Sequence, residues 1–398
     1  MKKIQTFRFA LRPTNNQENL FRQYAGACRF VYNRTLALEI ERHASGEKRL
    51  GYADATALLP LWKKEQETSW LSEINAQILQ QSLKDLDQAY QNFFKKKAGF
   101  PTFHKKSRKD SFRFPQGIKL DEQNSRLYLP KIGWVRYRKS RNVLGTVKSV
   151  TVRRTGEKWF VSIQTEREVE TPTHPNPGIV GVDLGVSRFA TLSDGTVFEA
   201  LDFKKEEKKI KRLQRALSRK KKGSKNREKT RKKLARLHRK VADKRNDTLH
   251  KISTQLVKSH AVIVVEDLNV KGMSSSASGT RENPGKNVRQ KAGLNRSILR
   301  QGWGTFLCIL EYKATWSGGM VLRIPPEYTS QRCSGCGHAD PKNRKSQSVF
   351  HCVACGLRMH ADLNAAINIE RAGHARLACG MKTCPEPRDS AQEPTEAA

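Results

Sequence analysis

Four of the eight cysteines form one cluster whose spacing is that of a metal site. Cys333 and Cys336 frame one Cys-x-x-Cys pair, and Cys352 and Cys355 frame another after fifteen intervening residues. Each pair can present two sulfurs to one ion, and two pairs complete a tetrahedron around Zn²⁺. Because four protein ligands leave no open position, we expect the zinc to be structural. In a reducing compartment such a cluster indicates a metal site and not disulfides.

Three acidic residues stand where an acid is costly unless something compensates it. Asp183 ends the apolar run that starts at Ile179, Glu266 ends the apolar run HAVIVVE, and Asp362 opens the helical segment HADLNAAINI. An acid at the end of a buried strand loses hydration, which a metal cation would compensate. Carboxylates that converge on two Mg²⁺ ions fit phosphodiester hydrolysis. Since Mg²⁺ uses few carboxylates and keeps several waters, three acids are sufficient.

Each acid also has an ordinary structural interpretation. Asp183 could form a turn before Gly185, and Asp362 could be a helix N-cap. Glu266 could merely flank Asp267, and the sequence leaves open which of the two points inward. The order of elements around the acids favours a shared role: a strand, a hairpin strand, a helix, a strand and a helix in this order predict an RNase H-like sheet.

The charge of the chain indicates a polyanionic partner. Its 398 residues carry 76 Lys+Arg and 38 Asp+Glu, a formal net charge of +38. This excess is too large for a typical enzyme of small molecules, and Lys or Arg side chains that meet phosphates release condensed counterions. The 37% of apolar residues is enough for a core, and the length suggests two or three domains.

The most basic segment is residues 204–245, which hold 22 Lys/Arg and four acids. Leu213 and Leu217 belong to one narrow apolar stripe, and Leu234 and Leu237 belong to another, on either side of Gly223. This pattern predicts an antiparallel helical hairpin with a thin apolar seam and a basic exterior. The alternative is a solvated charged helix, but so much charge of one sign repels itself without a polyanion.

Membrane insertion and secretion are not expected. The longest purely aliphatic run is 261–265, far shorter than the roughly 20 residues that span a bilayer. The N-terminus MKKIQTFRFALRP has scattered charge and no apolar core of a signal peptide. We therefore expect action in the cytoplasm or on the nucleoid.

Several elements must position these residues. Residues 3–11 alternate as a strand with one buried face, and 14–98 are helical, with a capping box between Thr14 and Gln17. Short alternating runs over 99–170 predict a small antiparallel β-domain that the first strand joins, and 171–178 read as a Pro-rich linker. Farther on we expect a loop over 271–287, helical structure over 298–316 and a disordered tail from 375.

Three aromatic residues of the predicted β-domain have two interpretations. Trp134, Tyr137 and Trp159 could stack on nucleic-acid bases, or they could belong to the core, which is the more frequent role of such residues.

The motifs around the acids are similar to those of one known family. GVDLGVSRFATLSDG, VVEDLNV and HADLNAAINI, with two zinc knuckles before the third, resemble the split RuvC-like nuclease domain of the transposon-encoded TnpB (OrfB) family. Further similar segments are FRFALRPTNNQENLFRQYAGACRFVYNRTL, GFPTFHKKS and YTSQRCSGCG. The zinc spacing is generic, whereas the three acidic motifs in this order are specific. The resemblance covers nearly the whole chain before residue 375.

The resemblance implies an RNA-guided DNA endonuclease related to type V CRISPR effectors. A guide RNA from the transposon end would pair with one strand of a target double-stranded DNA, and the protein would read a short motif beside the target. By motif position, Asp183, Glu266 and Asp362 would be the catalytic, magnesium-binding acids. No departure from the acidic pattern suggests an inactive relative. Neither the guide sequence nor the oligomeric state follows from the sequence.

The resemblance also implies a multidomain α+β architecture. Residues 1–13 and 99–175 would form a wedge-like, barrel-like antiparallel β-domain, and 14–98 a helical recognition domain. Residues 176–326 and 359–374 would form the RuvC-like nuclease domain, 327–358 the inserted zinc ribbon, and 375–398 the disordered tail.

Two other functions remain open from the sequence. A resolvase or a transposase proper could use the same fold and acids, because strand transfer and hydrolysis both suit them. A DNA-binding regulator of transposition with vestigial acids is the alternative from another class.

Overall fold

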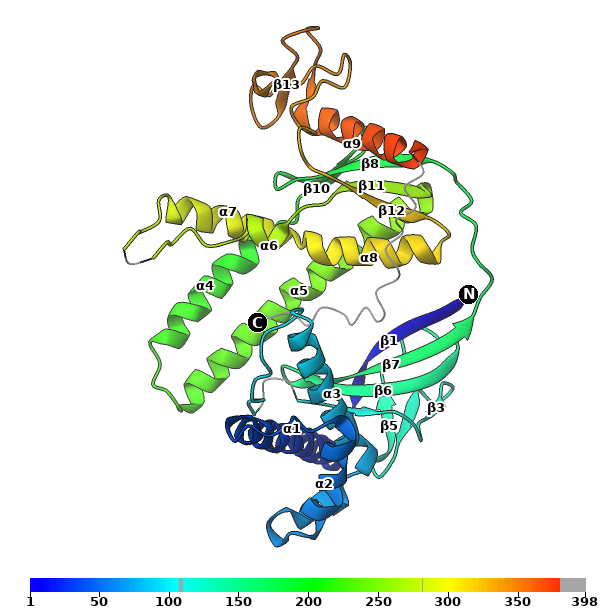
Figure 1. Ribbon diagram of the computed structural model, residues 1–398, viewed down its shortest axis with the longest axis vertical. Coiled ribbons are helices and arrows are strands. Elements are labelled where there is room, and N and C mark those ends of the chain that lie inside the picture. The colour runs from blue at the N-terminus through cyan, green and yellow to red at the C-terminus, as the bar shows by residue number, and fades with distance from the viewer. Residues whose placement is uncertain (107–109, 281, 380–398) are drawn as a thin grey trace. The chain divides into compact units, whose positions relative to one another are not determined.

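The computed structural model of the chain describes residues 1–106, 110–280 and 282–379 (Figure 1). The chain folds as two units, Met1–Glu170 and Thr171–Ala398. The boundary lies at the start of the Pro-rich segment 171–178 that the sequence predicts to be a linker. The protein is thus a multidomain chain of mixed helices and sheets.

The first unit combines three α-helices with one antiparallel sheet. The capping box at the start of α1 is confirmed, because the Gln17 amide donates to Thr14 Oγ1 at 3.3 Å and Thr14 N donates to Gln17 Oε1 at 3.1 Å. In chain order the elements are β1 (Lys2–Arg12), α1 (Asn15–Ala44), α2 (Tyr52–Lys64), the 3₁₀-helix η1 (Gln66–Glu73), α3 (Ala76–Phe94), β2 (Ser111–Phe114), β3 (Lys119–Asp121), β4 (Arg126–Leu129), β5 (Gly133–Tyr137), β6 (Thr146–Thr155) and β7 (Lys158–Glu168).

The seven strands of this unit are ordered β2-β6-β7-β1-β5-β4-β3. Strand β1 pairs antiparallel with both β7 and β5, which confirms that the N-terminal strand joins the β-domain. Phe7 and Phe9 on β1 pack in the same core as Phe21 on α1 and Ile78 on α3, so sheet and helices share one hydrophobic core. Among the aromatic residues, Tyr137 and Trp159 are buried in the core, whereas Trp134 is 40% exposed.

The second unit contains a five-stranded mixed sheet ordered β10-β9-β8-β11-β12. Strands β8, β11 and β12 are parallel to one another. Strand β9 pairs antiparallel with β8, and β10 pairs antiparallel with β9. In chain order the elements are β8 (Ile179–Leu184), β9 (Arg188–Leu192), β10 (Val197–Glu199), α4 (Lys204–Ser218), α5 (Lys225–Ser259), β11 (Val262–Glu266), α6 (Val270–Met273), α7 (Val288–Gln301), α8 (Trp303–Trp316), β12 (Met320–Ile324), the 3₁₀-helix η2 (Pro341–Asn343), β13 (Val349–His351), β14 (Arg358–His360) and α9 (Ala361–Ala378).

Helices cover both faces of this sheet (Figure 1). Val182 and Val265 point to the side of α5 and α8, where they share a core with Leu256 and Phe306. On the other face, Val264 and Ile324 pack against Ile369 of α9. A parallel strand pair buried on both faces explains why these strands are continuous apolar runs in the sequence.

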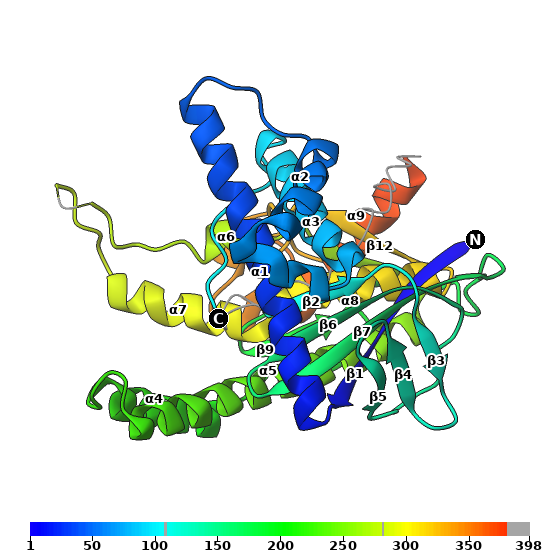
Figure 2. The same ribbon diagram turned by 90° about the horizontal axis from the view of Figure 1, so that it is seen from below.

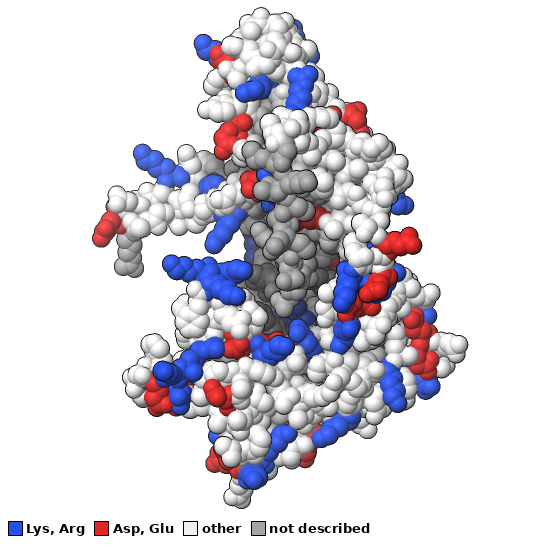
Figure 3. Space-filling model, turned by 45° about the vertical axis from the view of Figure 1, so that its right-hand side comes forward, with Lys and Arg blue, Asp and Glu red and all other residues white. Residues whose placement is uncertain are grey.

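The basic segment forms the predicted helical hairpin. Helices α4 and α5 lie side by side (Figures 1 and 2), joined in part by an ion pair of 2.6 Å between Lys244 and Glu206. No α4 residue is buried, so its Lys and Arg side chains meet solvent. Figure 3 shows Lys and Arg side chains on the surface of the molecule, interspersed with Asp and Glu. In the described ranges, no helix is long and apolar enough to span a membrane.

Three local expectations differ from the structure. The segment 298–316 is helical as expected except at Gly302, whose φ of +72° suits glycine and which separates α7 from α8. The loop expected over 271–287 includes part of the short helix α6. Helix α9 extends to Ala378, so the expectation of disorder is wrong for 375–378, while residues 380–398, including Cys384, lie outside the described residues.

Candidate active site and metal centre

The register of two parallel strands places Asp183 beside Glu266. Val182 of β8 pairs with Val265 of β11, and the two acids are the next residues on each strand. Because side chains alternate along a strand, both acids point to the same face as the residues two positions earlier, Gly181 and Val264. That face is the one covered by α9.

Glycines let α9 approach this face closely. A Cβ atom at Gly181 would collide with the carbonyl oxygen of Ala366 on α9, and one at Gly373 would collide with the side chain of Val264. Asp362 precedes Ala366 by one helical turn, so it lies on the same side of α9 and toward the end of β8 where Asp183 stands. The structure therefore brings the three acids predicted from the sequence to one edge of the sheet.

The three carboxylates interact electrostatically. Burial raises the pKa of Asp183 to about 7, and the nearby charges of Glu266 and Asp362 raise this pKa as well. Burial also raises the pKa of Glu266. Asp362 is only 8% exposed. The site thus concentrates negative charge that the protein compensates only in part.

The structure decides between the interpretations that the sequence left open. Glu266 points toward the other acids, whereas Asp267 is exposed and forms an ion pair of 3.0 Å with Arg323. The N-cap of α9 is His360, whose Nδ1 accepts a hydrogen bond from the amide of Asp362. The carboxylate of Asp362 is therefore available for another role.

Besides His360, whose Nδ1 lies 3.8 Å from Asp362 Oδ2, two more side chains contact the acids, and sequence reasoning missed both. Arg344 Nη2 lies 4.0 Å from Asp362 Oδ1, and its positive charge lowers the pKa of both Asp183 and Glu266. Thr329 Oγ1 donates a hydrogen bond of 2.5 Å to Glu266 Oε1. Both residues come from the segment between β12 and α9, which contains the cysteine cluster.

Two asparagines of α9 hold that segment against the helix. Asn364 and Asn368 are buried and lie one turn apart on α9. The side-chain amide of Asn364 donates to the carbonyl of Arg332 at 2.8 Å and accepts from the amide of Ser334 at 2.9 Å. The sequence does contain a signal for this contact, because two asparagines stand one turn apart on an otherwise apolar helix face.

A buried hydroxyl next to Asp183 has no partner. Thr191 of β9 is directly opposite Asp183 in the antiparallel pair, so both side chains share one face. Its Oγ1 is buried without a hydrogen-bond partner in the described part of the chain. An unpartnered hydroxyl beside a carboxylate fits a site that takes up a hydrated ion.

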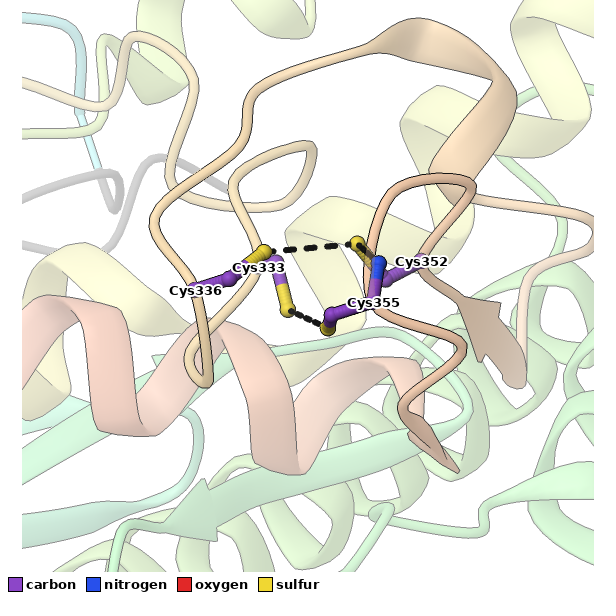
Figure 4. A group of neighbouring side chains, drawn as sticks. All are labelled: Cys333, Cys336, Cys352 and Cys355. Carbon is purple, nitrogen blue, oxygen red and sulfur yellow. Dashed lines mark hydrogen bonds between the residues drawn. The ribbon is translucent and has the colours of Figure 1, made fainter.

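The four clustered cysteines come together as the spacing predicts (Figure 4). The sulfurs of Cys333 and Cys355 are 3.6 Å apart, as are those of Cys336 and Cys352, and all four lie within 4.8 Å of one another. Sulfurs at about 2.3 Å from one zinc ion in a tetrahedron are separated by roughly 3.8 Å. The arrangement could therefore hold Zn²⁺ with only small adjustments.

Backbone amides support the thiolates. The amide of Gly335 donates to Cys333 Sγ at 3.3 Å, and the amide of Cys355 donates to Cys352 Sγ at 3.4 Å. Hydrogen bonds, the second of these foremost, lower the pKa of Cys352 to about 6, whereas hydrogen bonds with the neighbouring sulfurs and burial raise the pKa of Cys355 to about 12, so the metal-free cluster favours a thiolate at Cys352. Over residues 1–106, 110–280 and 282–379, these cysteines are the tightest cluster of potential metal ligands, and the three acids are more widely spaced.

A buried acidic site at the edge of a mixed sheet, in a strongly basic chain with a tetrathiolate cluster, is typical of enzymes that process nucleic acids. Three family models match the chain in agreement with this class. A model described as a probable transposase, OrfB of IS605, matches residues 162–277, and one described as a Cas12f1-like TNB domain matches 303–369. A third, described as a helix-turn-helix domain, matches 1–48, where the structure has strand β1 and the long helix α1.

Full-length relatives give the same result. A protein of Escherichia coli (strain K12) named as an RNA-guided DNA endonuclease, InsQ, is 55% identical over 397 residues, which cover 100% of this chain and 98% of the relative. A Streptomyces pristinaespiralis protein, also named as an RNA-guided DNA endonuclease, is 32% identical, with 96% of this chain and 93% of the relative covered. The chain belongs to the transposon-encoded OrfB (TnpB) family.

A solved structure shows a similar fold. The Cas12f1 chain in a cryo-EM structure of a Cas12f1–sgRNA–target DNA complex matches with a TM-score of 0.58 over 90% of this chain and 83% of that chain. The sequence identity of 16% makes this a likeness of fold alone.

Proposed function

We propose that this protein is an RNA-guided, divalent-metal-dependent DNA endonuclease encoded by an insertion sequence. The observation that carries the proposal is the meeting of Asp183, Glu266 and Asp362 at one edge of the sheet, although 179 residues separate the first from the last in the chain. Full-length relatives named as RNA-guided DNA endonucleases support the same activity.

We propose that the three acids hold two Mg²⁺ ions in an RNase H-like, RuvC-like domain. The strand order supports this assignment. Strand β8 is central, the antiparallel pairs of β9 and β10 lie on one side of it, and the parallel strands β11 and β12 lie on the other. The raised pKa of Asp183 and the unpartnered hydroxyl of Thr191 fit a cation site. When bound, the ions would activate a water and stabilise the leaving oxygen of a phosphodiester. The protein supplies the carboxylates, the burial and the Arg344 charge.

The remaining parts have roles that follow from their chemistry. The tetrathiolate would hold structural Zn²⁺ in the ribbon 327–358. The β-domain of 1–13 and 99–175 would be the wedge-like domain, and the helices of 14–98 the recognition domain. A guide RNA from the transposon end and a double-stranded DNA target beside a short motif would supply the polyanion that the charge of +38 requires. Such a protein would act on the nucleoid.

The test is to co-express the protein with RNA from the transposon end, sequence the RNA that co-purifies, and challenge the complex with a randomised target library and Mg²⁺. We expect cleavage of guide-matched DNA beside one short motif. RNA-independent cleavage would indicate a resolvase or transposase instead. Tight DNA binding without cleavage under any guide would indicate a regulator.

The basic hairpin should control the salt dependence of RNA binding. Lys222, Lys225, Lys229 and Lys233 are exposed on the hairpin and form no ion pair that the described residues show. If all four contact phosphates, replacing them with glutamine should reduce the slope of log K against log salt by about 3. Filter binding of the guide RNA at several salt concentrations measures this slope.

The control for this experiment is a set of four glutamine replacements at exposed lysines of the second unit outside residues 204–245, namely Lys258, Lys271, Lys286 and Lys342. An unchanged slope in the hairpin variant would contradict a role of α4 and α5 in binding RNA.

Removing the Arg344 charge should shift the pH dependence of cleavage upward. Arg344 lowers the pKa of Asp183 and of Glu266, so both pKa values should rise in Arg344→Gln, and fewer carboxylates would be ionised at a given pH. At limiting Mg²⁺ we expect roughly three- to tenfold slower cleavage at pH 7, with partial recovery at pH 8.5. Rates from pH 6 to 9 test this, with Arg344→Lys as the charge-conserving control. A uniform loss at every pH would refute the electrostatic role.

A further inference from the structure

The hydroxyl of Thr329 is hydrogen-bonded directly to a carboxylate of the site. It donates to Glu266 Oε1 at 2.5 Å and also lies 3.1 Å from the carbonyl oxygen of Pro326. Glu266 Oε2 has no hydrogen-bond partner in the part of the chain that the structure describes. The hydroxyl therefore fixes one oxygen of the carboxylate and leaves the other available.

The backbone around Thr329 is held in an unusual conformation. Tyr328, the preceding residue, has a φ of +62°, which is strained for a residue with a side chain. Its carbonyl accepts hydrogen bonds from the amides of Gln331 and Arg332 at 3.0 and 2.9 Å. This tight turn leaves Tyr328 64% exposed while Thr329 is 8% exposed. The strained backbone at Tyr328 thus occurs where the chain turns the side chain of Thr329 inward.

Helix α9 fixes the same turn from the other side. The side-chain amide of Asn368 donates to the carbonyl oxygens of Thr329 and Arg332 at 2.9 and 2.7 Å. The helix that carries Asp362 thus also holds the residue that contacts Glu266. Helix α9 is therefore linked to Glu266 by two hydrogen bonds, one from Asn368 to the carbonyl of Thr329 and one from the hydroxyl of Thr329 to Glu266.

We propose that Thr329 is a positioning residue that orients Glu266 for divalent-cation binding, with Asn368 holding Thr329 in place. The inference rests on the proposed nuclease function. Hydrogen bonds to a ligating carboxylate orient it, and their loss typically weakens metal binding or activity ten- to a hundredfold. Without the hydroxyl, Glu266 can turn away from the other two acids, which already repel it.

The test compares Thr329→Val, which keeps the shape and removes the hydroxyl, with Thr329→Ser, which keeps the hydroxyl. Each variant is assembled with guide RNA and target DNA. We expect the Mg²⁺ concentration for half-maximal cleavage to rise about ten- to a hundredfold in Thr329→Val and to stay within about threefold of the parent in Thr329→Ser. Mn²⁺ binding to the complex on a phosphorothioate target, followed by electron paramagnetic resonance, should weaken by the same ratio.

The outcomes separate the inference from the function on which it rests. A parent complex that does not cleave overturns the proposed function and the inference with it. If the parent cleaves and Thr329→Val has the parent's Mg²⁺ and Mn²⁺ dependence, the positioning role alone is wrong. Equal weakening in Thr329→Val and Thr329→Ser, or loss of zinc or target binding in Thr329→Val, would show that the residue only packs the turn, which also overturns the inference.

Discussion

Replacing Asp183 with asparagine should abolish DNA cleavage and at the same time stabilise the metal-free protein. The loss of cleavage should be roughly a thousandfold or more, because the variant lacks a carboxylate that would hold the catalytic ions. Binding of guide RNA and target DNA should remain, since the substitution preserves shape and adds no charge. Few substitutions are expected to raise stability while they remove activity.

The gain in stability follows from the ionisation of Asp183. The pKa of this carboxyl is about 7 in the folded protein against 3.8 for an ordinary aspartate. Below pH 3.8 the carboxyl is protonated in the folded and the unfolded state, so its ionisation does not lower the free energy of unfolding. Between pH 3.8 and 7 the destabilisation grows with pH, and above pH 7 it is complete. Asparagine does not ionise, so Asp183→Asn should be more stable by about 2–4 kcal/mol at pH 8 and by little at pH 4.

Urea unfolding at pH 4 and pH 8 with EDTA measures this difference. Asp267→Asn is the matched control, because Asp267 is adjacent to Glu266 in the chain but exposed, and this variant should cleave normally. Added Mg²⁺ should stabilise the parent more than Asp183→Asn and so reduce the difference between their free energies of unfolding. An Asp183→Asn variant that cleaves, or that is less stable than the parent at pH 8, would contradict the arrangement of the three acids.

Removing a zinc ligand should abolish DNA cleavage, although the cysteines are not among the three acids of the active site. In Cys352→Ser we expect loss of zinc, unfolding of residues 327–360 and a loss of cleavage about as large as in Asp183→Asn. Metal binding in isolated zinc fingers is worth roughly 10–16 kcal/mol, so a ribbon of this size should not fold without it. The segment also supplies Thr329 and Arg344, which both contact the acids.

Zinc content, limited proteolysis and cleavage together test this prediction. Cys379→Ser is the control, because Cys379 is an exposed cysteine outside the cluster. RNA binding by the basic hairpin should persist in both variants. A Cys352→Ser protein that keeps the ribbon protected from protease, or cleaves at the parent rate, would show that the cysteines do not hold a structural metal.

The acids and cysteines were accessible to sequence reasoning because their signals are local. An acid at the end of a buried strand, as at Glu266, or one residue before the end, as at Asp183, contrasts with the apolar residues before it. The spacing of Cys-x-x-Cys pairs is fixed by the geometry of one ion. The parallel register that brings Asp183 beside Glu266 is known only from the structure.

The residues that complete the site have no such signal. Arg344 and Thr329 reach the acids across a folded insertion, and one Arg or Thr in a polar segment resembles any other. The division of the helix at Gly302 was missed because apolar spacing continues on both sides, and only the φ of +72° shows the turn.

The placement of Asp362 on the last described helix has a consequence for biosynthesis. A ribosome produces Asp183 first, then the basic hairpin and then Glu266, well before α9 emerges. A nascent chain can therefore capture its nucleic acid while it is still unable to cut. Cleavage competence arrives only with α9, so a chain terminated upstream of Asp362 lacks one of the three acids.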